Sequence, residues 1–233
     1  MAPEPGDVDL ATQPAPVRDA ARVLFGDRVA VVERYARLLT TDGIARGLIG
    51  PREAPRIWQR HLLNCAAVAE LVPAGATLTD VGSGAGLPGI VIAVARPDAS
   101  VTLLEPMLRR TTFLTEAVAA LDLVDQVRVV RGRAEELAGR LPRADVVTAR
   151  ALTSLDRIAR WCLPLAKPGG KVLAFKGASA AREVADHRAA VRSLGGGPPV
   201  IHHCGVGLVE PPAVVVEIVR EGPAAGHRRG RRS

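Results

Sequence analysis

The residues best suited to chemistry in this sequence gather in one glycine-rich stretch, residues 77–90, which reads TLTDVGSGAGLPGI. An apolar strand is expected at 77–81, and Gly82, Gly84 and Gly86 then alternate before an apolar helical run begins at 87. Glycines allow positive φ and close approach of a ligand to the backbone, and a helix start presents unpaired N–H groups. A strand, a glycine turn and a helix start in this order predict a nucleotide-binding loop.

Two carboxylates at predicted strand ends bear on which nucleotide this loop binds. Asp80 lies where a buried carboxylate suits the cationic aminopropyl and sulfonium groups of S-adenosylmethionine and repels a pyrophosphate; capping of the turn is its alternative role. Glu105 closes the next strand, where a carboxylate accepts hydrogen bonds from a ribose diol in a methyltransferase or an NAD enzyme. Because Gly84, Gly86 and Gly89 formally match G-x-G-x-x-G, an NAD-dependent oxidoreductase stays an alternative.

The elements that must position these residues follow two patterns. Residues 17–75 have helical spacing: two helices within 17–41 break near Gly26 with Asp27 as the second N-cap, a loop covers 43–51, and an amphipathic helix covers 56–71. From 77 onward, strands are expected at 77–81, 100–104, 127–131, 145–149 and 171–175, and helices at 87–96, 108–121, 154–165 and 179–193. This alternation predicts a doubly wound, Rossmann-like α/β fold with a mostly parallel sheet.

The end of the chain breaks this alternation, because the runs 199–204 and 213–219 both favour strands and no helix lies between them. A terminal β-hairpin leaves one antiparallel strand, which is unusual in the dinucleotide-binding fold. We therefore expect a disordered N-terminal segment (1–16), a helical N-terminal region (17–75), a cofactor-binding domain (76–221) and a basic disordered tail (222–233).

The composition narrows the class of partner. The net charge is +7, and residues 227–233 (HRRGRRS) hold four arginines, which favours a polyanionic partner such as nucleic acid. No apolar stretch approaches the roughly 20 residues that span a bilayer, and the opening residues lack a signal-peptide pattern, so a cytoplasmic protein without membrane contact is expected. The odd, widely spaced Cys65, Cys162 and Cys204 predict neither a disulfide frame nor a metal site. We expect a monomer.

The glycine loop and several pieces around it resemble one known family over roughly residues 20–220, the bacterial small-subunit rRNA guanine-N7 methyltransferases (glucose-inhibited division protein B). The pieces are Asp80-Val81-Gly82-Ser83-Gly84-Ala85-Gly86-Leu87-Pro88-Gly89, Trp58-x-Arg60-His61-x-x-Asn64, Glu105-Pro106, Arg109-Arg110-x-x-Phe113-Leu114, Arg133-Ala134-Glu135, Thr148-Ala149-Arg150-Ala151 and Lys176-Gly177. The segment around Arg109 has arginine where the family typically has lysine, which keeps the charge but not the shape.

The resemblance implies a class I methyltransferase with a seven-stranded, mostly parallel sheet that ends in an antiparallel hairpin, behind a helical N-terminal extension. It implies S-adenosyl-L-methionine as the methyl donor, and N7 of one guanine in 16S rRNA, free or in the small ribosomal subunit, as the substrate. Together with the loop itself, it leads us to expect cofactor contacts from Asp80, Gly82, Gly84, Gly86, Leu87, Glu105, Ala134, Glu135 and Arg150.

Methylation at guanine N7 needs little from the protein besides position, because N7 already carries an in-plane lone pair. Arg150 and Lys176, at predicted strand ends, are the candidate catalytic residues. Arg150 can contact cofactor, a phosphate or guanine O6, and Lys176 a phosphate or the base. The expected substrate contacts are Arg60, His61, Asn64, Arg109 and Lys176; pinning the N-terminal region to the cofactor loop is the alternative role for His61 and its helix neighbours. A small-molecule methyltransferase and an inert nucleic-acid binder remain alternatives.

Overall fold

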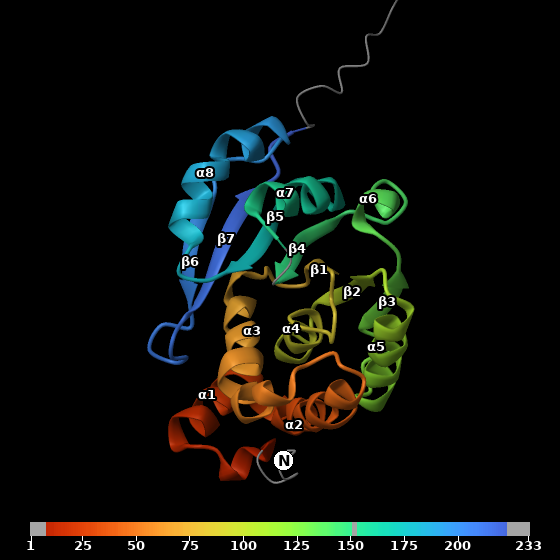
Figure 1. Cartoon of the computed structure of the whole chain (residues 1–233), viewed down its shortest axis with the longest axis vertical. Coiled ribbons are helices and arrows are strands. Elements are labelled where there is room, and N and C mark those ends of the chain that lie inside the picture. Colours follow the sequence, from red (N-terminus) through yellow and green to blue (C-terminus); the bar gives the residue numbers. More distant parts are fainter. Residues whose placement is uncertain (1–7, 151–152, 223–233) are drawn as a thin grey trace, which may run out of the picture.

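The alternating apolar segments form one seven-stranded sheet in the order β3-β2-β1-β4-β5-β7-β6 (Figure 1). The computed structural model describes residues 8–150 and 153–222. Neighbouring strands among the first five are parallel, while β7 is antiparallel to both β5 and β6. The strands are β1 (Thr77–Val81), β2 (Ser100–Glu105), β3 (Val127–Arg131), β4 (Ala144–Arg150), β5 (Ala166–Lys176), β6 (Val200–Cys204) and β7 (Ala213–Val219). The predicted doubly wound sheet and its terminal hairpin are confirmed.

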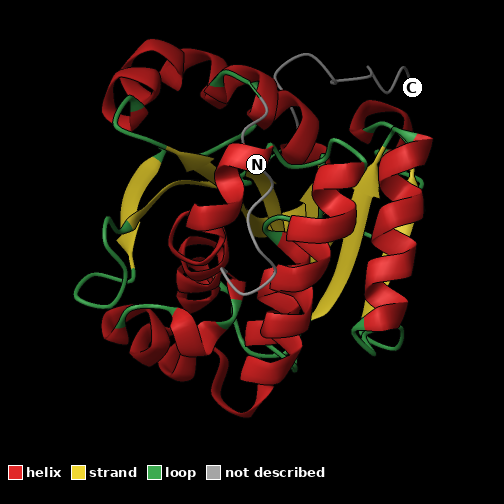
Figure 2. Ribbon diagram, turned by 60° about the horizontal axis from the view of Figure 1, so that its bottom comes forward, coloured by secondary structure: helices red, strands yellow, loops and turns green. Residues whose placement is uncertain are grey.

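Helices cover both faces of this sheet (Figure 2). They are α1 (Ala15–Phe25), α2 (Val29–Leu38), α3 (Asn64–Ala67), α4 (Gly89–Ala95), α5 (Leu108–Ala120), α6 (Ala134–Leu137), α7 (Leu155–Cys162) and α8 (Ala180–Ser193). One apolar core contains residues of the five helices α1 through α5 on one face of the sheet. A second core contains residues of α6, α7 and α8 on the other face. The central strands are buried on both sides, so successive residues such as Val146 and Val147 are both buried although their side chains point to opposite faces. Among the described residues, no helix combines the length and apolarity needed to cross a bilayer.

Several predicted boundaries differ from the structure. The helix expected at 56–71 is instead a π-helical stretch (Ile57–Leu63), the single turn α3 and a 3₁₀ turn (Val68–Leu71). Asp27 is not an N-cap, because it lies inside a 3₁₀ turn (Gly26–Arg28) that leads directly into α2. The strand expected at 171–175 is longer, because the pairing of β4 with β5 shifts between Ala144 and Val146 and absorbs the Lys-Pro-Gly-Gly segment as an irregularity within the strand.

The predicted disorder of residues 1–16 is wrong for residues 8–16. Val8 and Leu10 are buried, and the indole Nε1 of Trp58 donates a hydrogen bond of 2.8 Å to the carbonyl of Val8. This anchor is supplied by a residue 50 positions later, so the proline-rich composition gives no sign of it. Residues 1–7 and the predicted basic tail from 223 onward lie outside the described residues.

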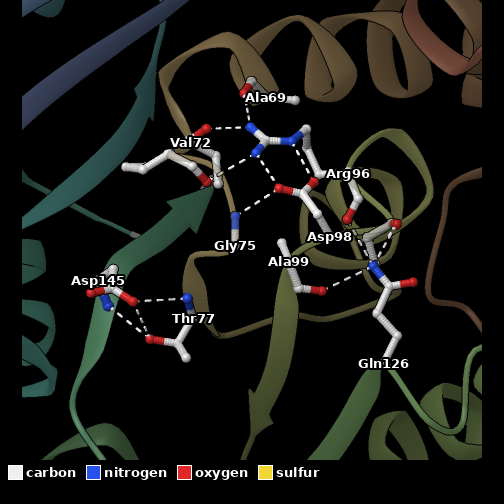
Figure 3. A network of polar contacts seen from close by, with 11 residues as sticks. Ala69, Val72, Gly75, Thr77, Arg96, Asp98, Ala99, Gln126 and Asp145 are labelled. Atoms are coloured by element: carbon white, nitrogen blue, oxygen red, sulfur yellow. Dashed lines mark hydrogen bonds and ion pairs between the residues drawn. The ribbon is translucent and has the colours of Figure 1, made fainter.

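Arg96 connects the carboxyl end of the N-terminal helical region to the sheet, next to the amino ends of β1 and β2 (Figure 3). The Arg96 guanidinium donates hydrogen bonds to the carbonyls of Ala69, Val72 and Pro73 and pairs with the Asp98 carboxylate at 2.7 Å. Asp98 in turn accepts a 2.7 Å hydrogen bond from the backbone N–H of Gly75. These bonds fix the segment that leads into β1. The predicted N-terminal region and the predicted cofactor-binding domain also share one apolar core.

Candidate cofactor and substrate site

The glycine loop after β1 is held by its own backbone. The N–H groups of Gly82 and Ser83 donate to the carbonyl of Leu104 at the end of β2, and Gly86 N–H donates to the carbonyl of Ser83. Gly82, Gly84 and Gly86 have φ values of +69°, +59° and +96°, which a side chain strains. At Gly86 a Cβ atom would also lie 2.5 Å from the Cδ1 atom of Ile90. The predicted strand, glycine turn and helix start are confirmed.

Asp80 lies beneath this loop, with 1% of its surface exposed. One carboxylate oxygen accepts a 2.8 Å hydrogen bond from the Thr148 hydroxyl, and the other accepts a 3.1 Å bond from Gly89 N–H at the start of α4. Burial raises the pKa of Asp80 to about 6. The structure thus shows the capping contact that the sequence left open as one role of Asp80, while its predicted cofactor contact stays a prediction.

Glu105 closes β2 beside the loop, as predicted. Its carboxylate is 1% exposed and accepts hydrogen bonds from the backbone N–H groups of Gly84 at 3.0 Å and Met107 at 3.1 Å. The Arg110 guanidinium adds an ion pair at 3.7 Å. Glu105 therefore ties the glycine loop to the carboxyl end of β2, where nucleotide-binding sheets place a ribose.

A cavity of about 200 Å³ opens over the carboxyl ends of β1, β2 and β3. It brings together three of the predicted cofactor residues, Gly82, Ala134 and Glu135. Its other lining residues are Val81, Leu104, Pro106, Gly132, Arg133 and Trp161. This lining is mostly apolar and includes the flat Trp161 ring, which suits an adenine better than a charged phosphate. Trp161 was not predicted, because no local sequence signal relates α7 to the end of β3.

A larger cavity of about 740 Å³ lies over the carboxyl ends of β4 and β5, whose last residues are Arg150 and Lys176. The lining residues are Arg56, Gln59, Arg60, Asn64, Arg150, Thr153, Phe175, Lys176, Gly177, Glu210 and Pro211. The structure thus brings together four predicted residues (Arg60, Asn64, Arg150, Lys176). It does not bring Arg109, which is exposed on α5 and does not line this cavity, and Leu87 lines neither cavity. Arg56, Gln59 and Glu210 were not predicted.

The Arg150 side chain is fixed by hydrogen bonds to three residues of the N-terminal region. Its guanidinium donates hydrogen bonds to the Cys65 thiol at 2.9 Å, the carbonyl of Arg60 at 3.1 Å and Nδ1 of His61 at 2.8 Å. Nε2 of His61 lies 2.8 Å from a carboxylate oxygen of Glu53. Burial and the neighbouring Arg150 lower the pKa of His61, so its imidazole is neutral near pH 7. These contacts join the N-terminal region to β4, which is the alternative role for His61, while its predicted substrate contact stays a prediction.

Lys176 lines the large cavity but is engaged within the protein. Its ammonium donates a 2.6 Å bond to the Glu183 carboxylate and a 2.7 Å bond to the carbonyl of Thr153, and its side chain is 8% exposed. Two of its three N–H donors are therefore in use. Asn64 donates a 3.3 Å hydrogen bond to the carbonyl of Pro211, which secures the loop carrying Glu210 at the opposite wall.

Within the described residues, no group of three or more His, Cys, Asp or Glu side chains is placed to hold a metal ion. The three cysteines are buried and unbridged. His202 lies in β6 with its Nε2 atom 3.5 Å from the Glu217 carboxylate of β7, so it belongs to a polar strand edge.

The sheet order, the glycine loop and the acid at the end of β2 define a Rossmann-like class I methyltransferase, whose methyl donor is S-adenosylmethionine. Solved methyltransferases share this fold. Mitomycin 7-O-methyltransferase MmcR is 21% identical with a TM-score of 0.58, over 94% of this chain and 73% of that one. The O-methyltransferase NcsB1 from neocarzinostatin biosynthesis, solved with S-adenosylmethionine, is 18% identical with a TM-score of 0.57, over 78% and 61%.

Sequence comparison identifies the family. The GidB family, described as rRNA small subunit methyltransferase G, matches residues 28–209. Ribosomal RNA small subunit methyltransferase G of Salinispora tropica is 64% identical over 98% of this chain and 99% of its own length, and that of Streptomyces coelicolor is 55% identical over 91% and 89%. The chain belongs to the rRNA small subunit methyltransferase G family. The oxidoreductase alternative is thereby excluded.

Proposed function

We propose that this protein transfers the methyl group of S-adenosylmethionine to N7 of a guanine in 16S rRNA of the small ribosomal subunit. The observation that carries the proposal is the large cavity over the carboxyl ends of β4 and β5, which is lined by Arg150, Lys176 and Arg60 together with one carboxylate, Glu210. Family membership supports rRNA as the substrate. We also propose that the protein acts as a cytoplasmic monomer without a metal ion.

The chemistry of guanine N7 fits this cavity. S-adenosylmethionine supplies an electrophilic methyl group on a sulfonium, and N7 attacks it with a lone pair that is already free, so no side chain has to remove a proton. In our proposal, Arg150 donates to guanine O6 alone, because a bidentate grip on O6 and N7 would block the nucleophile. Glu210 accepts from the N1–H and N2–H₂ groups of the opposite edge of the base, and Phe175 offers an apolar wall.

The small cavity and the loop supply the cofactor contacts in this proposal. The adenine occupies the cavity beside Ala134 and Glu135, and Gly82 allows close approach of the backbone. Glu105 holds the ribose diol with the acceptor capacity that its bonds to Gly84 and Met107 leave free. Asp80 acts indirectly, by fixing the start of α4.

Contacts with the RNA outside the target base come from exposed cationic and amide side chains at the rim of the large cavity. Arg56, Arg60 and Gln59 are exposed there and suit phosphates and sugars. Arg109 reaches more distant phosphates in our proposal. With six aromatic residues in the whole chain, stacking on single-stranded bases is limited, so RNA shape and phosphate contacts provide most of the recognition.

The experiment that tests the proposal measures transfer of labelled methyl groups to RNA from cells that lack the modification. Naked 16S rRNA and intact small subunits are compared as substrates, and N7-methylguanosine is mapped by borohydride and aniline cleavage. We expect label at one guanine N7. Label on an exocyclic amine, on a ribose hydroxyl, or on small molecules but not on RNA would contradict the proposal.

A further inference from the structure

A chain of three side chains stands behind the large cavity. Glu53 lies in the 3₁₀ segment Pro51–Arg56, His61 in the π-helical stretch, and Arg150 at the end of β4, 89 positions after His61. Glu53 and His61 are 2.8 Å apart, and His61 and Arg150 are also 2.8 Å apart. The His61 side chain is 14% exposed and that of Glu53 27% exposed, so solvent reaches this chain only partly.

The direction of each hydrogen bond follows from chemistry. An arginine cannot accept a hydrogen bond, so Nδ1 of His61 accepts from Arg150 and carries no proton. The imidazole proton is therefore on Nε2, which faces the Glu53 carboxylate. Glu53 thus favours the same His61 tautomer that Arg150 requires, the one that offers a lone pair to Arg150, as a carboxylate does for histidines in other enzymes.

The consequence for Arg150 is a fixed guanidinium. Three of its five N–H groups are used by Cys65, Arg60 and His61, and two remain for a ligand in the cavity. A long side chain that is held at three points loses little further entropy when it binds substrate. A protonated His61 would instead present an N–H and a positive charge to the guanidinium.

We propose that Glu53 and His61 are positioning residues for methyl transfer, which orient Arg150 toward the reacting base through the tautomer of His61. The inference rests on the proposed function, because that function places Arg150 at the guanine. A purely structural role, joining the N-terminal region to β4, is the competing explanation. The two differ in whether the effect of Glu53 requires an intact Arg150.

Other charged and titratable groups lie on both sides of the chain formed by Glu53, His61 and Arg150. The Arg60 guanidinium lies 3.3 Å from the second oxygen of Glu53, and Arg56 lies close enough to lower the pKa of that carboxyl. On the other side, Cys65 and the buried Asp80 lie near Arg150. Because Glu53 also pairs with Arg60, the test has to separate the two partners.

The test compares Glu53→Ala with Glu53→Gln, which keeps an acceptor for Nε2–H. We expect Glu53→Ala to slow methyl transfer at saturating substrates by about tenfold, and Glu53→Gln to restore it to within about threefold of wild type. The matched control is Glu116→Ala, which removes a 2.6 Å surface ion pair with Arg46 outside both cavities and should leave the rate unchanged. Thermal unfolding midpoints identify variants that fail to fold.

Two further measurements separate positioning from structure. In an Arg150→Lys background, which keeps the charge but not the fork of donors, Glu53→Ala should cost less than about twofold, because its effect acts through Arg150. In nitrogen NMR spectra, His61 should be the Nε2–H tautomer in wild type and a mixture in Glu53→Ala. A full tenfold loss in the Arg150→Lys background, or an unchanged tautomer, would overturn the inference.

Failure of this inference is distinguishable from failure of the proposed function. If wild-type protein methylates a guanine N7 while Glu53→Ala is as fast as wild type, the positioning role is wrong and the function stands. If wild-type protein leaves guanine N7 unmodified, the proposed function fails first.

Discussion

The hydroxyl of Tyr35 offers a sharp test of how the N-terminal region supports the cofactor loop. Tyr35 lies in α2, is fully buried, and donates a 2.7 Å hydrogen bond to the carbonyl of Ala85 between two loop glycines. Burial holds the pKa of Tyr35 well above its usual value, so the phenol keeps its proton and donates throughout the working range. Tyr35→Phe removes this one atom and keeps the shape of the ring.

The size of the effect follows from what the change leaves behind. The Ala85 residue is 7% exposed, so its carbonyl loses a partner that water replaces poorly. An unsatisfied buried carbonyl costs about 1–3 kcal/mol, so we expect a loss of about 1–2 kcal/mol in unfolding free energy. Because Ala85 is part of the loop, S-adenosylmethionine affinity should also fall, by about threefold to tenfold.

The assay combines urea unfolding with calorimetric titration of S-adenosylmethionine. Thr112→Val is the matched control, since it deletes a hydroxyl that bonds the Leu108 carbonyl on the exposed side of α5, and it should leave cofactor affinity unchanged. Wild-type affinity in Tyr35→Phe together with reduced stability would show that the N-terminal helices support the fold but not the cofactor loop. No change in either quantity would show that this hydrogen bond stabilises neither the fold nor the cofactor site.

Three other predictions concern the loop, acid stability and the tail. Gly82→Asp puts a side chain on a residue with φ of +69° at the cofactor cavity and should abolish S-adenosylmethionine binding in calorimetry; retained affinity would put the cofactor elsewhere. Arg96 and Gly75 N–H lower the pKa of Asp98, so its contribution to stability is present above about pH 4 and is lost as pH falls toward the depressed pKa (Figure 3). Asp98→Asn should therefore be less stable than wild type at pH 7, with a difference that shrinks below about pH 4; a difference independent of pH would argue against this pair. Deleting 223–233 should weaken RNA binding mainly at low salt, and a loss that persists at high salt would instead indicate specific docking.

The parts of the fold that were predictable depend on local pattern. The glycine loop, the strand ends at Glu105, Arg150 and Lys176, and the hairpin each have a local sequence signal, and the structure has them there. The length of β5 was not predictable, because its extra residues pair with β4 and β7 across a register shift. The order of residues 8–16 likewise depends on Trp58, a distant residue.

The candidate site was predictable where one motif carries it and not where distant segments meet. Gly82, Ala134 and Glu135 converge on one cavity, as their order after the strands indicates. Glu53 and Glu210 belong to no local motif. Glu53 is relevant because it contacts His61, and Glu210 because it lines the same cavity as Arg150, the last residue of β4. The role of Asp80 depended on Thr148 of β4, which is 68 positions later in the chain, so the sequence left two readings open.

The most direct test of the account is a crystal structure of this protein with S-adenosylhomocysteine. We expect the adenine in the cavity beside Ala134 and Glu135, the ribose at Glu105, and the sulfur facing the large cavity that Arg150 lines. A nucleoside bound away from the loop after β1, or a sulfur that faces away from the large cavity, would contradict the claim that this edge of the sheet brings cofactor and guanine together.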